Sequence, residues 1–139
     1  MAPYLAHQSA LHRMSTFPKK PVYDEWIPGR ALAAYVAVAQ NTELQISIYA
    51  PQKYDAALWE QLFDRIRKVP KSVPIWVGLD ANGTIGPDPP SEVSPPDPQA
   101  EAQDQNGTAL IEFCQLGRLA MVNTRVPGRL SGITWTHPD

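Results

Sequence analysis

The sequence has little of several features that mark common protein classes. It contains one cysteine, Cys114, so no disulfide can form within the chain. Lys and Arg number 12 against 14 Asp and Glu, and this balance provides no broad basic face for a nucleic acid. No run of eighteen apolar residues occurs, and residues 1–16 lack the apolar core of a signal peptide. These absences predict an intracellular protein without a membrane span.

The composition that remains is typical of a globular domain. Hydrophobic residues make up 43% of the 139 residues and charged residues 19%, which is enough apolar surface to form a core. Residues 1–28 show no sustained apolar period, and we expect irregular structure there. We therefore divide the chain into a lead-in, residues 1–25, and one domain, residues 26–139.

The first half of the domain has the pattern of strands followed by a helix. Residues 31–38 and 44–49 read as two strands joined by a turn. Apolar residues then recur at helical spacing over 51–69, with Asp55 as the expected N-cap, and a strand returns over 74–79. The order of strand, helix and strand favours a parallel or mixed sheet with a covering helix, although an antiparallel arrangement stays open.

The second half begins with an unusual segment. Residues 87–105 are rich in proline and acidic residues and have no apolar period, which predicts a flexible loop, either disordered or acting as a substrate lid. A second helix is expected from Asn106, as its N-cap, to Gly117. Short strands are expected over 119–124 and 133–136.

The stretch 73–86 carries the candidate chemistry. Its apolar run ends abruptly at Asp80, Ala81, Asn82 and Gly83. Asp80 and Asn82 are two residues apart and would project to the same side of a strand end, where a carboxylate and an amide can bind a cation or a phosphoryl oxygen. On these residues alone an ordinary turn is the favoured interpretation, because Asp, Asn and Gly are common in turns.

Several motifs, in this order along the chain, resemble the endonuclease/exonuclease/phosphatase superfamily with its DNase-I-like fold, and in particular its retrotransposon-type endonuclease branch. The resemblance covers residues 26–139. The motifs are Ile27-Pro-Gly-Arg-Ala-Leu-Ala33, Ile48-Tyr-Ala-Pro-Gln52, Val77-Gly-Leu-Asp-Ala-Asn82, the segment from Asn106-Gly107 to Cys114, Leu119 with Asn123-Thr124, and Thr134-Trp-Thr136.

The resemblance implies a fold, a reaction and site residues. The fold would be part of a DNase-I-like α/β sandwich, in which a mixed sheet carries covering helices. The activity would be hydrolysis of DNA or another phosphodiester with Mg²⁺ or Mn²⁺ as the cofactor. By this resemblance Asp80 would orient or deprotonate the attacking water, Asn82 would contact the phosphate or the metal, and Tyr49 would hydrogen-bond the phosphate.

The sequence departs from the family at positions that matter for catalysis. Leu79 stands where an acidic residue is usual, and the family's Gln-Glu motif, which supplies a metal ligand, does not occur before Glu25. The family's closing Ser-Asp-His is absent too. We therefore expect a hydrolase fragment that is inactive alone. The alternatives are a non-catalytic interaction remnant that associates with itself through uncovered sheet surfaces, and a fragment of a phosphatase for phosphoinositides or small phosphoesters.

Overall fold

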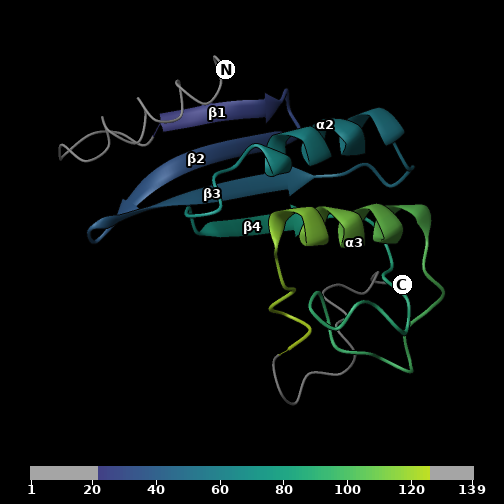
Figure 1. The fold of residues 1–139 in the computed structure, drawn as a ribbon. Helices are drawn as coiled ribbons and strands as arrows, with labels where there is room; N and C mark the ends of the chain where they lie inside the picture. The colour runs from purple at the N-terminus through teal and green to yellow at the C-terminus, as the bar shows by residue number, and fades with distance from the viewer. Residues whose placement is uncertain (1–21, 126–139) are drawn as a thin grey trace, which may run out of the picture. The chain divides into compact units, whose positions relative to one another are not determined.

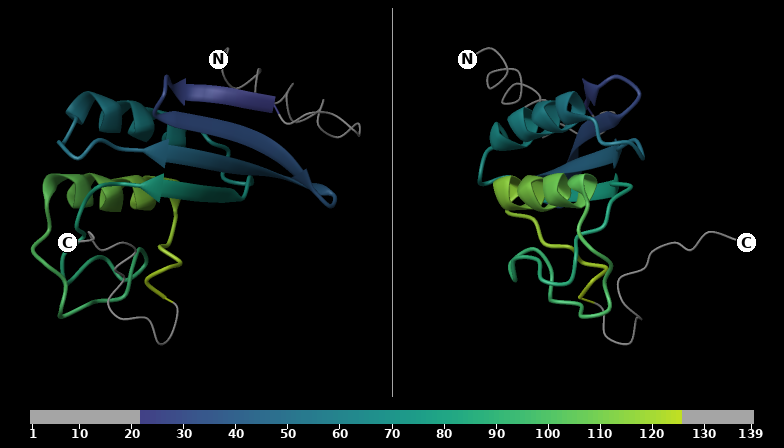
Figure 2. Two further views of the ribbon diagram at one scale, coloured as in Figure 1. Left: turned by 180° about the vertical axis from the view of Figure 1, so that it is seen from behind. Right: turned by 90° about the vertical axis from the view of Figure 1, so that its right-hand side faces the viewer.

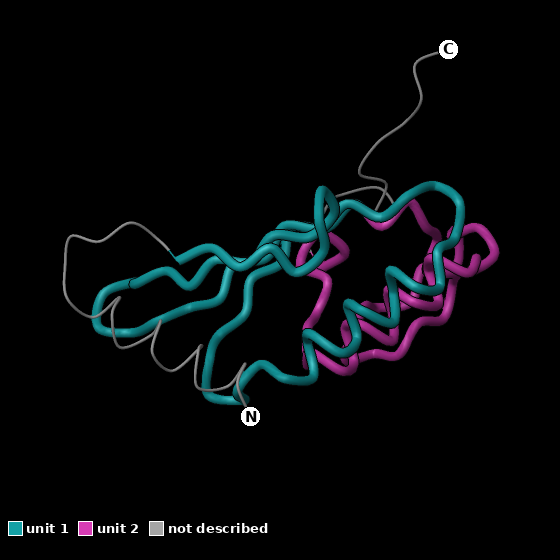
Figure 3. Tube along the Cα trace, turned by 90° about the horizontal axis from the view of Figure 1, so that it is seen from above, with its two compact units in different colours: residues 1–80 teal, residues 81–139 magenta. Residues whose placement is uncertain are grey.

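The computed structural model describes residues 22–125, within a chain that divides into two compact units, residues 1–80 and 81–139 (Figure 3). In the described range, the first unit holds a four-stranded sheet and a helix, and the second holds a helix and long connecting segments (Figure 1). No described helix is long and apolar enough to cross a membrane. The elements are β1 (Val22–Ile27), β2 (Ala31–Val38), β3 (Asn41–Tyr49), α2 (Ala56–Arg67), β4 (Ile75–Asp80) and α3 (Gln105–Gly117).

The sheet of the first unit is mixed. Its strand order is β1-β2-β3-β4, with antiparallel pairing of β1 with β2 and of β2 with β3. β3 and β4 are parallel, because the chain returns through α2 before it enters β4. The predicted α/β class, with a mixed sheet and a covering helix, is confirmed, whereas the DNase-I-like sandwich stays a hypothesis.

Alternating side chains give the sheet two unlike faces. Ala33 and Tyr35 of β2 pair with Ile46 and Leu44 of β3, and all four are buried. The residues between them point to the other face, as the period of two in a strand requires. The hairpin turns at Ala39, which adopts the left-handed conformation at φ 53°. One face of the sheet therefore forms the core of the unit.

Helix α2 covers that core face (Figure 2). The predicted N-cap is confirmed: the Asp55 carboxylate accepts a hydrogen bond from the Leu58 N–H at 3.1 Å. An ion pair of 3.7 Å between Arg65 and Asp24 also joins the helix to β1, but both side chains are more than a third exposed and it adds little stability. Burial of the apolar face of α2 contributes most of the stability of this packing. The buried residues are Leu58, Trp59, Leu62, Phe63 and Ile66.

Two predictions about strands are wrong. Residues 22–27, assigned to the irregular region, form β1. This strand lies at the edge of the sheet and is mostly exposed, so its sequence shows no apolar alternation. Residues 119–124, predicted as a strand, form none; the Met121 N–H donates a hydrogen bond to the Val93 carbonyl. Residues 1–21 and the predicted strand 133–136 lie outside the described residues.

In the second unit, the N-cap of α3 lies two residues earlier than expected. Its N-cap is Asp104, whose carboxylate accepts a hydrogen bond from the Gly107 N–H, so the prediction that Asn106 caps the helix is wrong. The helix ends at Gly117, as predicted, and Arg118 takes the left-handed conformation at φ 55°. Burial raises the pKa of the Cys114 thiol to about 11, so the only cysteine is an inert core residue.

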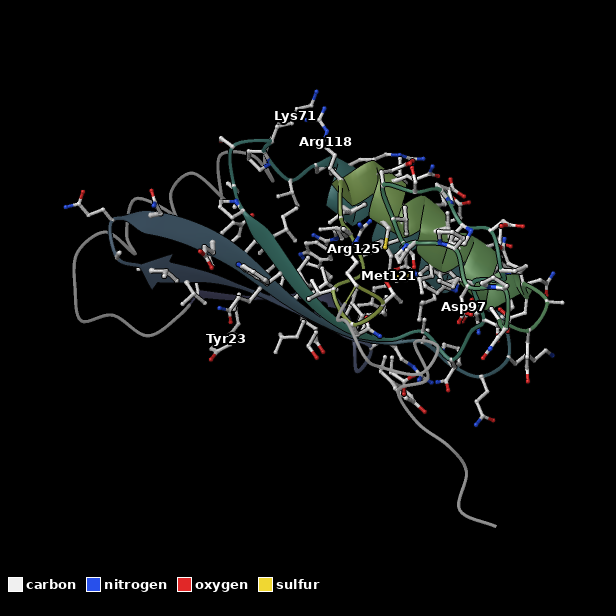
Figure 4. All side chains as sticks on the ribbon, turned by 90° about the horizontal axis from the view of Figure 1, so that it is seen from below. Tyr23, Lys71, Asp97, Arg118, Met121 and Arg125 are labelled. Atoms are coloured by element: carbon white, nitrogen blue, oxygen red, sulfur yellow. The ribbon has the colours of Figure 1, made fainter. Side chains whose placement is uncertain are left out.

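The proline-rich segment 87–105 contains no strand, and no helix before α3 begins at its last residue, as predicted. Some of its side chains are nevertheless buried. Val93 and Ser94 are fully buried, and the Ser94 hydroxyl donates a hydrogen bond to Thr124 Oγ1 at 3.0 Å. Arg125 donates to the Ser91 carbonyl at 2.8 Å and to the Glu92 carbonyl at 3.1 Å, and lies against this segment in Figure 4. The flexibility of the segment stays a prediction.

Ionisation of Tyr35 should destabilise the first unit. Tyr35 is 1% exposed, and burial, with a smaller effect of the Asp24 charge, raises its pKa from 10.0 to about 12. The unfolded chain releases this proton first, so the contribution of Tyr35 to stability is fully present below pH 10 and falls by about 2 to 3 kcal/mol between pH 10 and 12. Denaturant unfolding across this range should show a smaller decline for Tyr35→Phe. Equal declines in both proteins would contradict this cause.

Candidate functional site

The carboxyl ends of β3 and β4 meet at one edge of the sheet. Because these strands are parallel and in register, their last residues, Tyr49 and Asp80, are cross-strand neighbours. The Ala50 N–H donates a hydrogen bond to the Asp80 carbonyl at 2.8 Å and extends the pairing past the strand end. Two of the three predicted site residues are thus brought together, on the sheet face opposite α2.

Arg30 lies on the other side of Tyr49, and no role was predicted for it. The Tyr49 N–H donates a hydrogen bond to the Arg30 carbonyl at 2.8 Å, so Arg30 lies beside Tyr49 on the side away from Asp80. Its guanidinium carbon is 5.2 Å from the centroid of the Tyr49 ring, a cation–π distance. We call Arg30, Tyr49 and Asp80 the strand-end row. The sequence signal for this row is weak. Arg30 belongs to the motif that starts at Ile27, and that motif predicts a strand and assigns no role to its arginine.

The strand-end row is accessible to a ligand. Tyr49 is 49% exposed, Asp80 is exposed and Arg30 is half-buried. The row presents a planar cation and a phenol hydroxyl, which can both donate to a phosphate oxygen, and a carboxylate that can accept a proton or orient a water. This combination of groups suits binding of a singly charged phosphodiester.

Asn82 belongs to the second unit and has a structural role there. Its backbone is left-handed, at φ 46°, a conformation that Asn tolerates better than most residues. The Asn82 carbonyl accepts a hydrogen bond from the side-chain amide of Asn106 at 3.0 Å, and Asn106 is 3% exposed. The turn interpretation of this position therefore has direct structural support.

The segment after Asn82 is held against the start of α3 by a clamp of Thr84, Asp104, Asn106 and Gly107. The Asp104 carboxylate accepts hydrogen bonds from the N–H groups of Thr84 at 3.1 Å and Gly107 at 2.6 Å. The Asp104 N–H donates to the Thr84 carbonyl at 3.1 Å. Gly107 lies so close to this carbonyl that a Cβ would overlap it. The Asn-Gly pair quoted in the resemblance thus has a packing reason.

The described residues do not form a cation site by themselves. Within residues 22–125, no three His, Cys, Asp or Glu side chains are grouped so that they could hold a metal ion. Asp80 is the carboxylate of the strand-end row, and Glu25 accepts a hydrogen bond from the Gly29 N–H at 3.1 Å. A single carboxylate does not fit a Mg²⁺ site unless the substrate supplies further oxygens.

Comparison of the chain with known protein families, with curated proteins and with solved structures finds no match in any of the three. The resemblance to the endonuclease/exonuclease/phosphatase superfamily therefore stays a hypothesis that depends on the order of its motifs and on the strand-end row.

The clamp predicts that adding a single methyl group at Gly107 destabilises the second unit. Gly107→Ala should lower the free energy of unfolding by about 1 to 3 kcal/mol, because the new Cβ would overlap the Thr84 carbonyl and the loop must move. Gly78→Ala is the matched control, since a Cβ at Gly78 meets nothing within 4 Å. Chemical denaturation monitored by circular dichroism measures both. Equal effects at the two glycines would exclude the clamp.

Proposed function

We propose that the chain derives from a metal-dependent phosphodiester hydrolase of the endonuclease type, and that it keeps a phosphate-contacting half-site without catalysis of its own. The observation that supports this most directly is the strand-end row. Parallel pairing puts Tyr49 next to Asp80, and the Arg30 guanidinium lies against the Tyr49 ring. The tyrosine and the aspartate are the residues that the resemblance assigns to phosphate contact and to activation of water.

Each member of the row has a separate role in this proposal. The Arg30 guanidinium neutralises one phosphate charge and can donate two hydrogen bonds to a pair of oxygens. The Tyr49 hydroxyl donates to a third oxygen, and the Arg30 contact fixes the direction of its ring. Asp80 accepts a hydrogen bond from the attacking water and so orients it.

The same row accounts for the proposed lack of activity. Hydrolysis needs positive charge on the phosphate oxygens as well as an oriented water. A carboxylate beside a phosphodiester repels it unless a cation lies between them, and the described residues group no further ligands for that cation. Arg30 is the one cation of the strand-end row, which permits weak binding of the phosphate and supplies no group for the leaving oxygen.

Binding should therefore respond to the three residues with different signs. In EDTA at low salt, Arg30→Gln and Tyr49→Phe should weaken binding of a fluorescent single-stranded DNA dodecamer severalfold, because each loses a donor to phosphate. Asp80→Asn should tighten binding by removing a repulsive charge. Fluorescence anisotropy measures all three. Arg67→Gln is the matched control, since Arg67 lies on α2 and pairs with Asp64. Weaker binding by Asp80→Asn would contradict the metal-free arrangement.

Catalysis is tested separately. The purified chain should not nick supercoiled plasmid DNA in the presence of Mg²⁺ or Mn²⁺, because the described residues contain no group of three His, Cys, Asp or Glu side chains that could hold the metal. Robust nicking that Asp80→Ala abolishes would overturn the proposed inactivity. The same binding assay with inositol trisphosphate in place of DNA distinguishes the phosphatase alternative. Tighter binding of the small phosphoester would favour that class.

A further inference from the structure

The face of the sheet opposite α2 is exposed and carries large apolar side chains. We define this open face by the three rows of residues that cross the strands there. Among its members, Tyr23 is 63% exposed, Trp76 58%, Tyr49 49% and Leu32 43%. Tyr23 extends away from the sheet in Figure 4. Aromatic side chains left in water at this density mark an interaction surface.

The register fixes which residues share each row. The first row, which lies nearest the start of β4, consists of Tyr23, Ala34, Gln45 and Trp76. The second consists of Glu25, Leu32, Ser47 and Gly78. The third is the strand-end row of Arg30, Tyr49 and Asp80. Large aromatic residues thus stand at the two outer strands of the first row, with small or flexible residues between them.

The open faces of two copies of the chain are complementary when the rows of one copy run in the opposite direction to the rows of the other. A two-fold axis parallel to the strands, midway between β2 and β3, would put β1 of one copy over β4 of the other. Tyr23 then faces Trp76 of the second copy, and the same contact repeats on the other side. Sheets that pack face to face lie about 10 Å apart, a gap that aromatic side chains from both sides can fill.

The strand-end row has the matching charge pattern. It is positive at Arg30, aromatic at Tyr49 and negative at Asp80. The two-fold axis makes the rows of the two copies run in opposite directions, so the positive end of each lies toward the negative end of the other. A row with one sign of charge would repel itself in this arrangement. The charge order therefore favours a second copy of the chain as the partner.

A nucleic acid fits the open face less well. Aromatic residues on a sheet can stack with unpaired bases, but such surfaces also need a positive groove for the backbone. The three rows contain one cation, Arg30, and two carboxylates, Glu25 and Asp80. The net charge of the rows is −1, so Arg30 can still contact a single phosphodiester. A polyanion along the whole face is opposed more strongly than a second copy, whose rows also carry a net charge of −1.

We propose that the open face is the interface of a two-fold symmetric homodimer in which Tyr23 of each copy packs on Trp76 of the other. The open face has four strands about 4.8 Å apart and extends over five residues of about 3.3 Å each. Its flat area is therefore on the order of 300 Å² per copy, without the extra area of protruding side chains. This is below the ~800 Å² per partner of a standard interface. The dimer is therefore weak, with a dissociation constant in the micromolar range or above.

This inference goes beyond the proposed function and does not depend on it. A dimer would cover the strand-end row, so self-association and phosphodiester binding would compete. Tyr23 and Trp76 lie outside that row, and substitutions there test the interface without altering the proposed phosphate contacts.

Sedimentation of the full chain over increasing concentration, up to about 0.5 mM, tests the dimer. The wild-type protein should shift from monomer to dimer. Tyr23→Glu and Trp76→Lys should each weaken association by about tenfold or more, because each damages two symmetric contacts. Tyr54→Glu is the matched control: Tyr54 is 37% exposed and precedes α2, outside the open face.

Mixing the two variants gives the decisive measurement. In an equimolar mixture, the mixed dimer keeps one intact Tyr23–Trp76 contact and replaces the other by a Glu–Lys pair, so it should form more readily than either variant alone. Circular dichroism of each variant confirms its fold before mixing. No gain on mixing, or a monomeric wild-type protein, would overturn the proposal. A wild-type monomer whose tryptophan fluorescence is quenched by single-stranded DNA would overturn it in favour of a nucleic-acid partner.

Discussion

The parallel pairing of β3 with β4 is the constraint on which the candidate site depends. Parallel strands place their carboxyl ends at the same edge of a sheet, and here those ends are Tyr49 and Asp80. An antiparallel β4 would put them at opposite edges. The direction of β4 is in turn set by α2, since the chain must return along one face before a parallel strand can form. Burial of the apolar face of α2 thus stabilises the core and also positions the candidate phosphate contacts.

The two faces of the sheet follow from the same register. Residues that alternate toward α2 are buried, and Leu44 and Ala33 are 0% exposed. The residues between them point to the other face and remain in water. Burial of the apolar surface of Tyr23 and Trp76 would be favourable. An exposed aromatic face and a strand-end row of mixed charge therefore occur together. The proposed phosphodiester binding and the proposed self-association would use the same surface, so each would limit the other.

The order of elements was largely predictable because it depends on local pattern. The hairpin, the covering helix with its Asp55 cap and the following strand all carry clear periodicity or capping residues. The errors occur where a local signal is misleading. β1 is an exposed edge strand without alternation, and residues 119–124 are apolar but have no strand partner among the described residues. Asn106 is a good N-cap residue by type, yet Asp104 takes that position and Asn106 bonds to the Asn82 carbonyl.

The sequence by itself determined the α/β class and the helix boundaries to within a few residues. It also determined that an apolar strand ends at the polar residue Asp80. These depend on spacing and residue type, which a single chain displays directly. The tertiary structure decided which polar residues act together. It put Arg30 against Tyr49, joined Tyr49 to Asp80 and gave Asn82 to the turn clamped at α3. Such groupings depend on strand direction and register, which long-range packing sets and no local pattern records.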